Sequence, residues 1–226
     1  MKAGIKLNEG PKNFEIKEIA IPPLTDKEVL IQVKASGICG VDVLIYEWAI
    51  GKTFPVKTPL ILGHEASGII VDLGKQVERL KIGDRVTVES MIGCGKCHNC
   101  QQGLTNLCSL HWEHIGITMN GCFAEYFKAP MEIVHPLPEN VSFESGAFVE
   151  PLSIVVNMFD RIRFTLGNTI AIIGPGTLGL LAIQAARSYG ASQIIVLGLE
   201  KDERRLLKAR EIGADVTIVT DQGDPI

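Results

Sequence analysis

A glycine-rich turn at residues 174–179 (GPGTLG) constrains the fold of this chain more than any other feature. The turn lies between an apolar run, Thr169–Ile173, and a segment with helical spacing, Leu178–Tyr189. In a G-x-G-x-x-G turn the first glycine permits the tight bend, the second lets a pyrophosphate approach the backbone, and the third lets the helix pack on the strand. The helix N-terminus then faces the anion. This context predicts a dinucleotide-binding unit rather than a turn without a ligand, with the candidate cofactor residues Gly174, Gly176, Leu178 and Gly179.

The residues after this helix continue the alternation of strands and helices. Gln193–Leu197 and Val216–Val219 predict two further strands, and the charged, amphipathic segment Asp202–Ile212 predicts the helix between them. This is the first half of a Rossmann-type, doubly wound parallel sheet, in which a run such as TIAII is expected to be buried on both faces. A sheet of six strands needs roughly 80–100 more residues. We therefore expect a partial domain over residues 156–226, and the alternative is a compact three-stranded variant.

The choice of cofactor depends on the residues that follow the second strand. In such folds an acidic residue about twenty positions beyond the glycine turn holds the ribose hydroxyls of NAD. Glu200 follows Gly179 by 21 residues and is the candidate. Gly198 occupies the position where an aspartate would end the strand, and Arg204 and Arg205 could meet the 2′-phosphate of NADP. The sequence favours NAD, with NADP as the alternative, and assigns Glu200 and Arg205 to the cofactor.

The first half of the chain is rich in predicted strands. Alternating apolar and polar residues, or short β-branched runs between glycine-containing turns, are typical of half-buried strands. This pattern occurs at Glu28–Ala35, Gly68–Leu73, Arg85–Glu89, Phe123–Ala129 and Ile133–Pro136. The character of the sequence changes near residue 150. We expect two domains, a β-rich one over residues 1–155 and an α/β one over residues 156–226.

Four of the six cysteines follow the pattern C-x2-C-x2-C-x7-C. Four thiolates at this spacing can converge on one tetrahedral zinc ion and leave no position for water. The pattern predicts a closed, structural zinc site formed by Cys94, Cys97, Cys100 and Cys108. Disulfides, an iron–sulfur cluster and a nucleic-acid-binding zinc ribbon are the alternatives, but the residues around the cluster are not markedly basic.

A second group of metal-binding side chains is dispersed along the chain. Cys39 lies in GICG, His64 and Glu65 lie in GHE, and Glu150 lies in VEPL. A lone cysteine or histidine is usually a core residue. Together the four residues supply a thiolate, an imidazole and two carboxylates, and a catalytic zinc needs three protein ligands with one open position. They are candidates for a catalytic metal site, and Asp42 is expected to support the Cys39 loop through hydrogen bonds.

The composition excludes several classes of function. A net charge of −4 and a pI of about 5.8 argue against nucleic acid or an anionic membrane as a partner, because both need a basic surface. Residues 164–186 carry no charge, but Gly-Pro-Gly interrupts them, which favours a strand and a helix over a membrane span. The N-terminal residues lack the apolar core of a signal peptide. The clustered cysteines indicate a reducing compartment, and we expect a cytoplasmic protein.

As a set, these motifs resemble the zinc-dependent medium-chain dehydrogenases, in particular the branch of sorbitol and threonine dehydrogenases. The matching segments are GICGVD at 37–42, GHEASG at 63–68, GDRV at 83–86, the cysteine lobe at 94–108, VEPLS at 149–153 and GPGTLG at 174–179. The resemblance implies a GroES-like catalytic domain before the Rossmann-type domain, and two zinc ions per chain. It implies that Cys39 and His64 are zinc ligands, that Glu65 is a ligand or lies next to the ion, and that Glu150 binds directly or through water.

The resemblance also implies an activity, the transfer of hydride between NAD(P) and a secondary alcohol, a polyol or a threonine-like amino alcohol. Relatives usually carry a Ser or Thr and a His, thought to relay the substrate proton, where this chain has Val41 and Leu44. A carbonyl reductase and a non-catalytic zinc- or nucleotide-binding protein are therefore the alternatives. Relatives are often dimers or tetramers, so a homo-oligomer is a further expectation.

The remaining candidate residues have no spacing that joins them to either cluster. They include the four histidines His98, His111, His114 and His135. Cys122 is expected to be a small buried residue. Trp48 and Trp112 could line a substrate cleft, and packing is the alternative.

Overall fold

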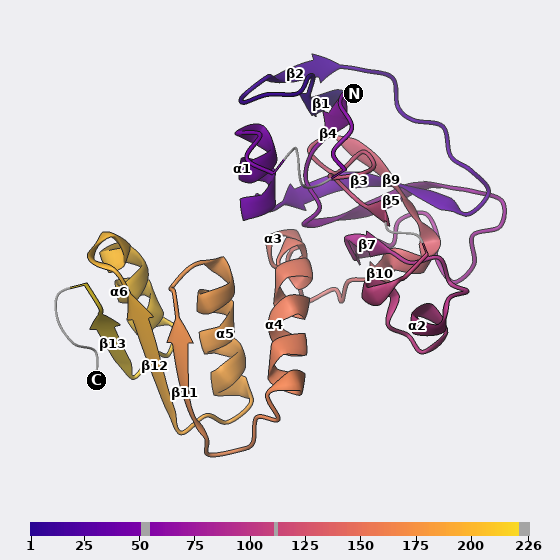
Figure 1. Cartoon of the computed structure of the whole chain (residues 1–226). Helices are drawn as coiled ribbons and strands as arrows, with labels where there is room; N and C mark the ends of the chain where they lie inside the picture. The colour runs from indigo at the N-terminus through magenta and orange to yellow at the C-terminus, as the bar shows by residue number, and fades with distance from the viewer. Residues whose placement is uncertain (51–54, 111–112, 222–226) are drawn as a thin grey trace. The chain divides into compact units, whose positions relative to one another are not determined.

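The computed structural model describes residues 1–50, 55–110 and 113–221, so His111 and Trp112 lie outside the described residues. The chain divides into two compact units, Met1–Glu150 and Pro151–Ile226. Figure 1 shows their elements. The sequence-based boundary lies five residues later, inside helix α4 (Val149–Arg161).

An antiparallel sheet of five strands forms the core of the first unit. Its strand order is β10-β6-β5-β3-β9. The strands are β3 (Glu28–Ser36), β5 (Ala66–Leu73), β6 (Arg85–Val88), β9 (Tyr126–Pro130) and β10 (Val134–Pro136). All five coincide with strands that the sequence predicts, with ends shifted by at most three residues. Their inward-facing β-branched side chains, among them Val29, Ile31, Ile70 and Val86, form the buried core.

Short elements around this sheet carry or flank most of the candidate metal-binding residues. A second antiparallel sheet has the order β2-β1-β4, and β7 pairs with β8. The strands are β1 (Lys2–Lys6), β2 (Phe14–Glu18), β4 (Leu60–Ile61), β7 (Met91–Ile92) and β8 (Glu113–His114). The helices are α1 (Gly40–Tyr46), α2 (His98–Gln101) and α3 (Phe143–Ala147), with 3₁₀ turns η1 (Thr105–Leu107) and η2 (Met131–Ile133).

Lys6 at the end of β1 is fully buried and joins three segments. Its Nζ donates hydrogen bonds to the carbonyl oxygens of Gly10, of Lys12 at 2.7 Å and of Tyr46 at 3.0 Å. Nζ also lies 5.4 Å from the ring centroid of Trp48. Burial lowers the pKa of this lysine, and the charge of Glu47 opposes that effect. The ammonium group therefore holds the loop after β1 to the end of α1.

Replacing Lys6 with Met should lower the free energy of unfolding by about 1–3 kcal/mol, because three carbonyls lose a charged donor while the apolar stem is retained. Urea unfolding would measure the change. Lys17→Met is the matched control, since Lys17 in the wild type only pairs with Glu15 on the surface. Equal stability of Lys6→Met and the control would show that the three carbonyls are satisfied by water instead.

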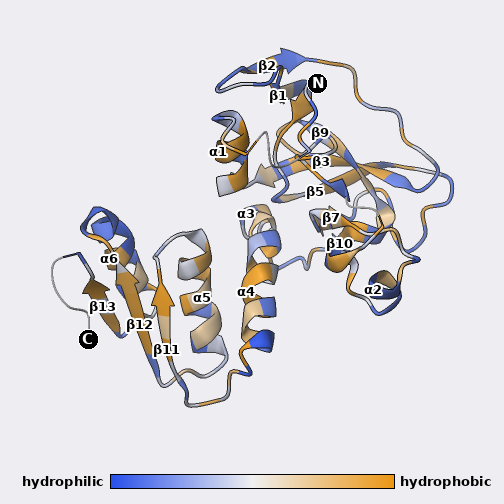
Figure 2. Ribbon diagram, in the orientation of Figure 1, coloured by the Kyte–Doolittle hydropathy of each residue, from blue (hydrophilic) through white to orange (hydrophobic). Residues whose placement is uncertain are grey.

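The second unit contains a three-stranded parallel sheet in the order β11-β12-β13. Its strands are β11 (Thr169–Ile173), β12 (Gln193–Gly198) and β13 (Val216–Val219), and α5 (Thr177–Ser188), η3 (Glu200–Asp202) and α6 (Glu203–Glu211) connect them. Figure 2 shows the strands as the most hydrophobic elements of this unit. The predicted first half of a doubly wound sheet is confirmed.

One expectation for this sheet was wrong. β11 was predicted to be buried on both faces, but only Ile170 and Ile172 face the core formed with α4 and α5. Ile173 is 87% exposed. β11 is an edge strand of the described sheet, and its alternate side chains have no layer packed over them within the described part of this unit. Among the described helices, none is both long and apolar enough to cross a membrane.

Candidate functional site

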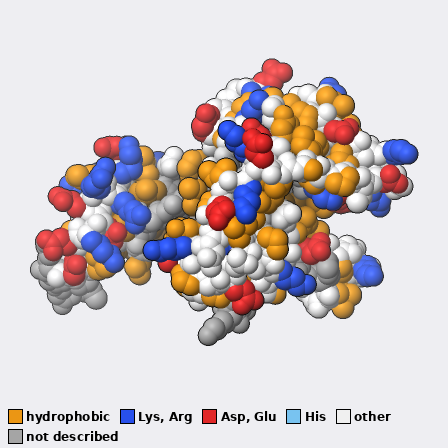
Figure 3. All heavy atoms as spheres, turned by 90° about the horizontal axis from the view of Figure 1, so that it is seen from above, with side chains coloured by type: hydrophobic (Ala, Val, Ile, Leu, Met, Phe, Trp, Pro, Cys, Tyr) orange, Lys and Arg blue, Asp and Glu red, His pale blue; other side chains and the backbone are white. Residues whose placement is uncertain are grey.

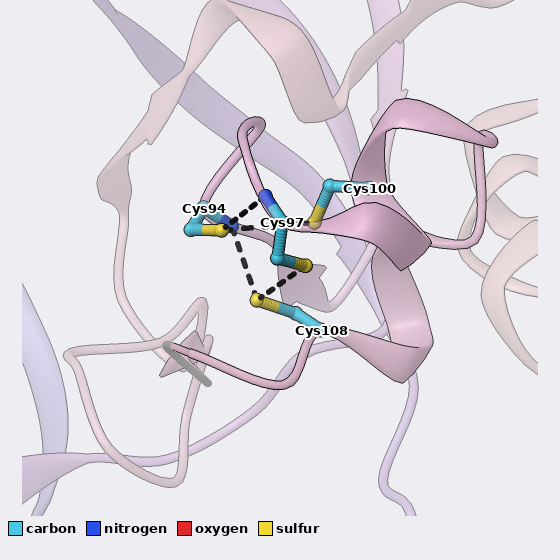
Figure 4. A group of neighbouring side chains, drawn as sticks. All are labelled: Cys94, Cys97, Cys100 and Cys108. Atoms are coloured by element: carbon cyan, nitrogen blue, oxygen red, sulfur yellow. Dashed lines mark hydrogen bonds between the residues drawn. The ribbon is translucent and has the colours of Figure 1, made fainter.

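The four clustered cysteines converge from three short elements. Cys94 follows β7, Cys97 and Cys100 lie at and within α2, and Cys108 follows η1. Figure 4 shows their sulfur atoms pointing toward one another. All four Sγ atoms lie within 4.8 Å of one another; two of the separations are 4.0 Å, for Cys94 and Cys100, and 3.9 Å, for Cys97 and Cys108. Zinc–sulfur bonds of about 2.3 Å in a tetrahedron place sulfur atoms about 3.8 Å apart, so the four residues fit a zinc ion.

Backbone amides favour the thiolate form that a metal requires at Cys94, Cys97 and Cys108, while burial raises the pKa of the Cys100 thiol to about 12. The amide of Cys97 donates to Sγ of Cys94 at 3.3 Å, and the amide of Cys94 donates to Sγ of Cys108 at 3.4 Å. Amides of Cys100 and Ser109 lower the pKa of the Cys97 thiol to about 5. A lowered pKa of a thiol raises the fraction of the nucleophilic, metal-binding thiolate.

The second cluster combines two loops of the first unit. Cys39 precedes α1, and His64 and Glu65 lie between β4 and β5. One ligand atom from each of Cys39, His64 and Glu65 lies within 4.8 Å of the others. His64 is 3% exposed and Glu65 is 5% exposed. The donor set of one thiolate, one imidazole and one carboxylate suits zinc.

Electrostatics around this cluster favour a bound cation. Burial, together with the charges of Glu65, Asp42 and Glu150, raises the pKa of the Cys39 thiol to about 11, although the amide of Val41 lowers it. Burial, Glu150 and Asp42 also raise the pKa of Glu65. Burial lowers the pKa of His64 to about 4, so its ring is neutral near pH 7 and can act as a ligand. A divalent cation would offset the repulsion among these groups.

Asp42 forms a hydrogen bond to the Cys39 loop, as the sequence predicted, and it also connects this loop to the loop of Gly63 and His64. Its Oδ2 accepts the amide of Cys39 at 2.9 Å, and its Oδ1 accepts the amide of Gly63 at 3.0 Å. Oδ1 also lies 3.8 Å from Nδ1 of His64. This nitrogen is buried and has no hydrogen-bond partner among the described residues. Because one amide belongs to Cys39 and the other directly precedes His64, this carboxylate links the two loops that carry these candidate ligands.

Glu150 lies close enough to this cluster for its charge to act on it. Its Oε1 accepts a hydrogen bond from Oγ of Ser90 at 2.6 Å. Burial raises the pKa of Glu150, while the Ser90 hydroxyl lowers it. The charge of Glu150 in turn raises the pKa values of Cys39 and Glu65. The structure therefore places Glu150 around the same centre, beyond the three groups that lie within 4.8 Å of one another.

The glycine turn of the second unit has the geometry that its motif requires. Gly174 has a φ of +94°, which favours glycine, and its amide donates to the carbonyl of Leu197 at 2.8 Å. A Cβ at Gly179 would lie 2.0 Å from the carbonyl oxygen of Gly174, so α5 can pack on the turn only with glycine there. A Cβ at Gly176 would meet open space, which leaves the start of α5 accessible to an anion.

The family model of the alcohol dehydrogenase GroES-like domain matches residues 25–139, just over half of this chain. The chain belongs to this family, the zinc-dependent medium-chain dehydrogenases. It is 40% identical over 225 residues to a sorbitol dehydrogenase of Halalkalibacterium halodurans, covering 99% of this chain and 64% of the relative. It is 39% identical over 226 residues to an L-threonine 3-dehydrogenase of Bacillus velezensis, covering 100% of this chain and 64% of the relative.

The fold agrees with this membership. The crystal structure of a zinc-binding dehydrogenase from Sinorhizobium meliloti bound to NADP matches with a TM-score of 0.90 and 35% identity. The match covers 99% of this chain and 63% of that structure. The resemblance to medium-chain dehydrogenases is thus confirmed, and this chain spans 64% of the length of the two curated relatives.

Val41 and Leu44, the two apolar residues at the positions where relatives usually carry polar residues, both lie on α1. Val41 is half-buried and packs with a small core that includes Ile45, and Leu44 is 42% exposed. Neither side chain can donate or accept a proton. Trp48 packs against the same small core, which agrees with the packing alternative.

His114 is the site residue that the sequence did not reveal. Its ring lies edge-on to the ring of His64, with centroids 4.9 Å apart and planes at 86°. Nδ1 of His114 lies 2.7 Å from the carbonyl oxygen of Ile115, so this nitrogen carries the proton. Fifty residues separate the two histidines. The signal that joins them is glycine at 63 and 116, because a Cβ at Gly116 would lie 2.5 Å from the carbonyl oxygen of Gly63.

The two polar candidates for cofactor binding, Arg205 and Glu200, differ in whether they line a cavity. Arg205 lines two cavities beside the glycine turn. Glu200 lies in η3, where its amide donates to Oδ1 of Asp221 at 2.9 Å, and it is not among the described residues that line either cavity. Leu178 is 42% exposed in the first turn of α5.

Proposed function

We propose that this chain serves the zinc-dependent oxidoreduction of a secondary alcohol, with hydride passing between the substrate carbon and a nicotinamide dinucleotide. The observation that carries the proposal is the convergence of Cys39, His64 and Glu65 in a domain of the alcohol dehydrogenase family. The relatives named for sorbitol and L-threonine support a polyol or an amino alcohol as the substrate. The NADP of the Sinorhizobium meliloti structure supports a dinucleotide cofactor.

In this proposal residues 1–155 form the catalytic domain, and residues 156–226 belong to the dinucleotide-binding domain. Cys94, Cys97, Cys100 and Cys108 hold a structural zinc ion, and Cys39 and His64, with Glu65, hold a second one. The six free cysteines are in accord with a reducing, cytoplasmic compartment. When bound, zinc supplies Lewis acidity that lowers the pKa of an alcohol, and the nicotinamide accepts hydride.

The chain's own residues position the candidate metal ligands, accept the substrate proton and bind the cofactor. Asp42 holds the Cys39 and Gly63 backbones in place, and the ring of His114 packs against the ring of His64. Because Val41 and Leu44 are apolar, we assign the substrate proton to the carboxylate of Glu150, which the hydroxyl of Ser90 orients at Oε1. Gly174, Gly176, Leu178 and Gly179 position the pyrophosphate of the cofactor at the start of α5.

Metal analysis and turnover of the same preparation test the proposal. Purified chain should contain two zinc ions, one lost readily to a chelator and one held tightly. Polyols and amino alcohols should then reduce NAD⁺ or NADP⁺, and restoring zinc to chelator-treated protein should restore the rate. Fewer than two ions, or iron in place of zinc, would contradict the site assignment. Two ions with dinucleotide binding but no turnover in either direction, on alcohols or on the matching ketones, would favour a non-catalytic protein.

A further inference from the structure

Two cavities meet at the loop that follows β12, and they share a basic rim. The first, of about 500 Å³, is lined by the glycine turn, Gly198 and Thr220 among others. The second, of about 610 Å³, lies along the start of α6. Lys201, Asp202 and Arg205 line both. A ligand bound at the glycine turn can therefore extend into the second cavity past these three side chains.

The charges around the second cavity are those of an anion site. Its lining includes four basic side chains, Lys201, Arg204, Arg205 and Lys208, and one acidic side chain, Asp202. The carboxylate of Asp202 is already engaged, since Oδ2 accepts the amide of Leu199 at 3.2 Å and Oδ1 lies 3.6 Å from Arg205. Within the described residues Lys201 and Arg204 form no ion pair. Figure 3 shows Lys and Arg side chains in blue on the surface of this unit.

The position that selects NAD in such folds lacks a carboxylate here. β12 ends at Gly198, which is buried and lines the first cavity. Glu200, two residues later, lies outside the lining of both cavities. An acidic residue at the end of this strand would accept hydrogen bonds from the ribose hydroxyls of NAD and repel a phosphate. Glycine provides neither effect, so nothing at the end of β12 opposes a phosphate on the ribose.

We infer that this unit selects NADP(H) over NAD(H), with the 2′-phosphate bound by Arg205 and Lys201 between the two cavities. The inference rests on the proposed function, which supplies the dinucleotide, and it departs from the preference for NAD that the sequence suggested. The guanidinium of Arg205 matches the geometry of a phosphate, and the ammonium of Lys201 adds a second charge. The phosphate would also compensate the excess of positive charge that surrounds Asp202.

Binding of two adenine nucleotides to the 226-residue chain tests the inference without turnover. Adenosine 2′,5′-bisphosphate and 5′-AMP share the adenosine and the 5′-phosphate, and isothermal titration calorimetry would compare them. The bisphosphate should bind at least tenfold more tightly than AMP. Arg205→Ala and Lys201→Ala should each weaken binding of the bisphosphate about tenfold and change the affinity for AMP less than twofold. Arg210→Ala removes the same charge from α6 outside both cavities and should leave the ratio unchanged.

A second pair of variants tests the role of Gly198. A Cβ there would lie 3.1 Å from side-chain atoms of Leu206 and Pro175, so Gly198→Ala measures the effect of size alone. Gly198→Asp should reverse the preference, so that AMP binds more tightly than the bisphosphate. Equal binding of both nucleotides to the wild type, or a tenfold preference that survives Arg205→Ala and Lys201→Ala, would overturn the inference. Failure of both nucleotides to bind would overturn the dinucleotide site and the inference with it.

Discussion

Replacing Cys97 with serine should remove one zinc ion from each chain and unfold the lobe at residues 93–108. The lobe has little else to hold it, because α2 and η1 contain seven residues together and both Leu104 and Leu107 are exposed. In zinc-finger peptides, metal binding contributes about 10–16 kcal/mol at pH 7, most of which drives folding. A serine hydroxyl does not replace a thiolate ligand. Elemental analysis would show one zinc ion in place of two, and limited proteolysis would cleave within the lobe.

Cys122→Ser is the matched control for this prediction. Cys122 is 1% exposed and its Sγ lies 3.3 Å from Oγ of Ser36, but it belongs to neither cluster. Serine there should lower the stability of the core and leave two zinc ions bound. Retention of both ions by Cys97→Ser, with the lobe still resistant to protease, would show that the four cysteines do not form a metal site.

The sequence predicts best those parts of the structure whose signal lies within a short segment of the chain. The four cysteines occupy fifteen residues, and the glycine turn and its flanking strand and helix occupy about twenty, so their spacing alone determines most of their geometry. The same holds for the five strands of the main sheet, whose alternation is visible within each segment. The Cys39 cluster was harder, because its ligands lie on different loops. The family resemblance joined them, and no pattern of spacing would have done so.

Other features of the fold and the site depend on contacts between segments that are far apart in the chain, and the sequence did not predict them. The apolar run at β11 does not reveal whether a further layer covers it, since the period of a strand reports its own side chains and not its neighbours. His114 reaches His64 only because two glycine backbones pack together at 63 and 116. Glu200 has the right separation from Gly179, and its role in binding the ribose stays a prediction, because Glu200 lies in the η3 turn and outside the lining of both cavities beside the glycine turn. Separation along the chain does not determine which side chains of a turn face a cavity, and the pocket lining shows Lys201 and Asp202 there instead.

Replacing Asp42 with alanine should weaken both the fold of the first unit and its second metal site. The carboxylate is 3% exposed and accepts two backbone amides, one at each ligand loop. Without it both amides are buried and unpaired, so we expect a loss of about 3–5 kcal/mol in the free energy of unfolding. Groups that orient metal ligands typically contribute about 10–100-fold in affinity. Competition with a chelator should show that loss for the more labile ion only, while the four-cysteine site retains its metal.

Two further variants separate the role of charge from that of hydrogen bonding. Asp42→Asn keeps one carbonyl acceptor and replaces the other with a donor, so it should lose one of the two amide bonds and lie between wild type and Asp42→Ala in both measurements. Asp84→Ala removes a carboxylate that accepts a single surface amide, from Lys81 at 2.9 Å, and should cost less than about 1 kcal/mol with no change in metal affinity. If Asp42→Ala lowered stability and left the affinity of the labile ion unchanged, Asp42 would support the loops of the fold without determining how Cys39 and His64 meet, and the metal centre would have to be organised by the ion itself.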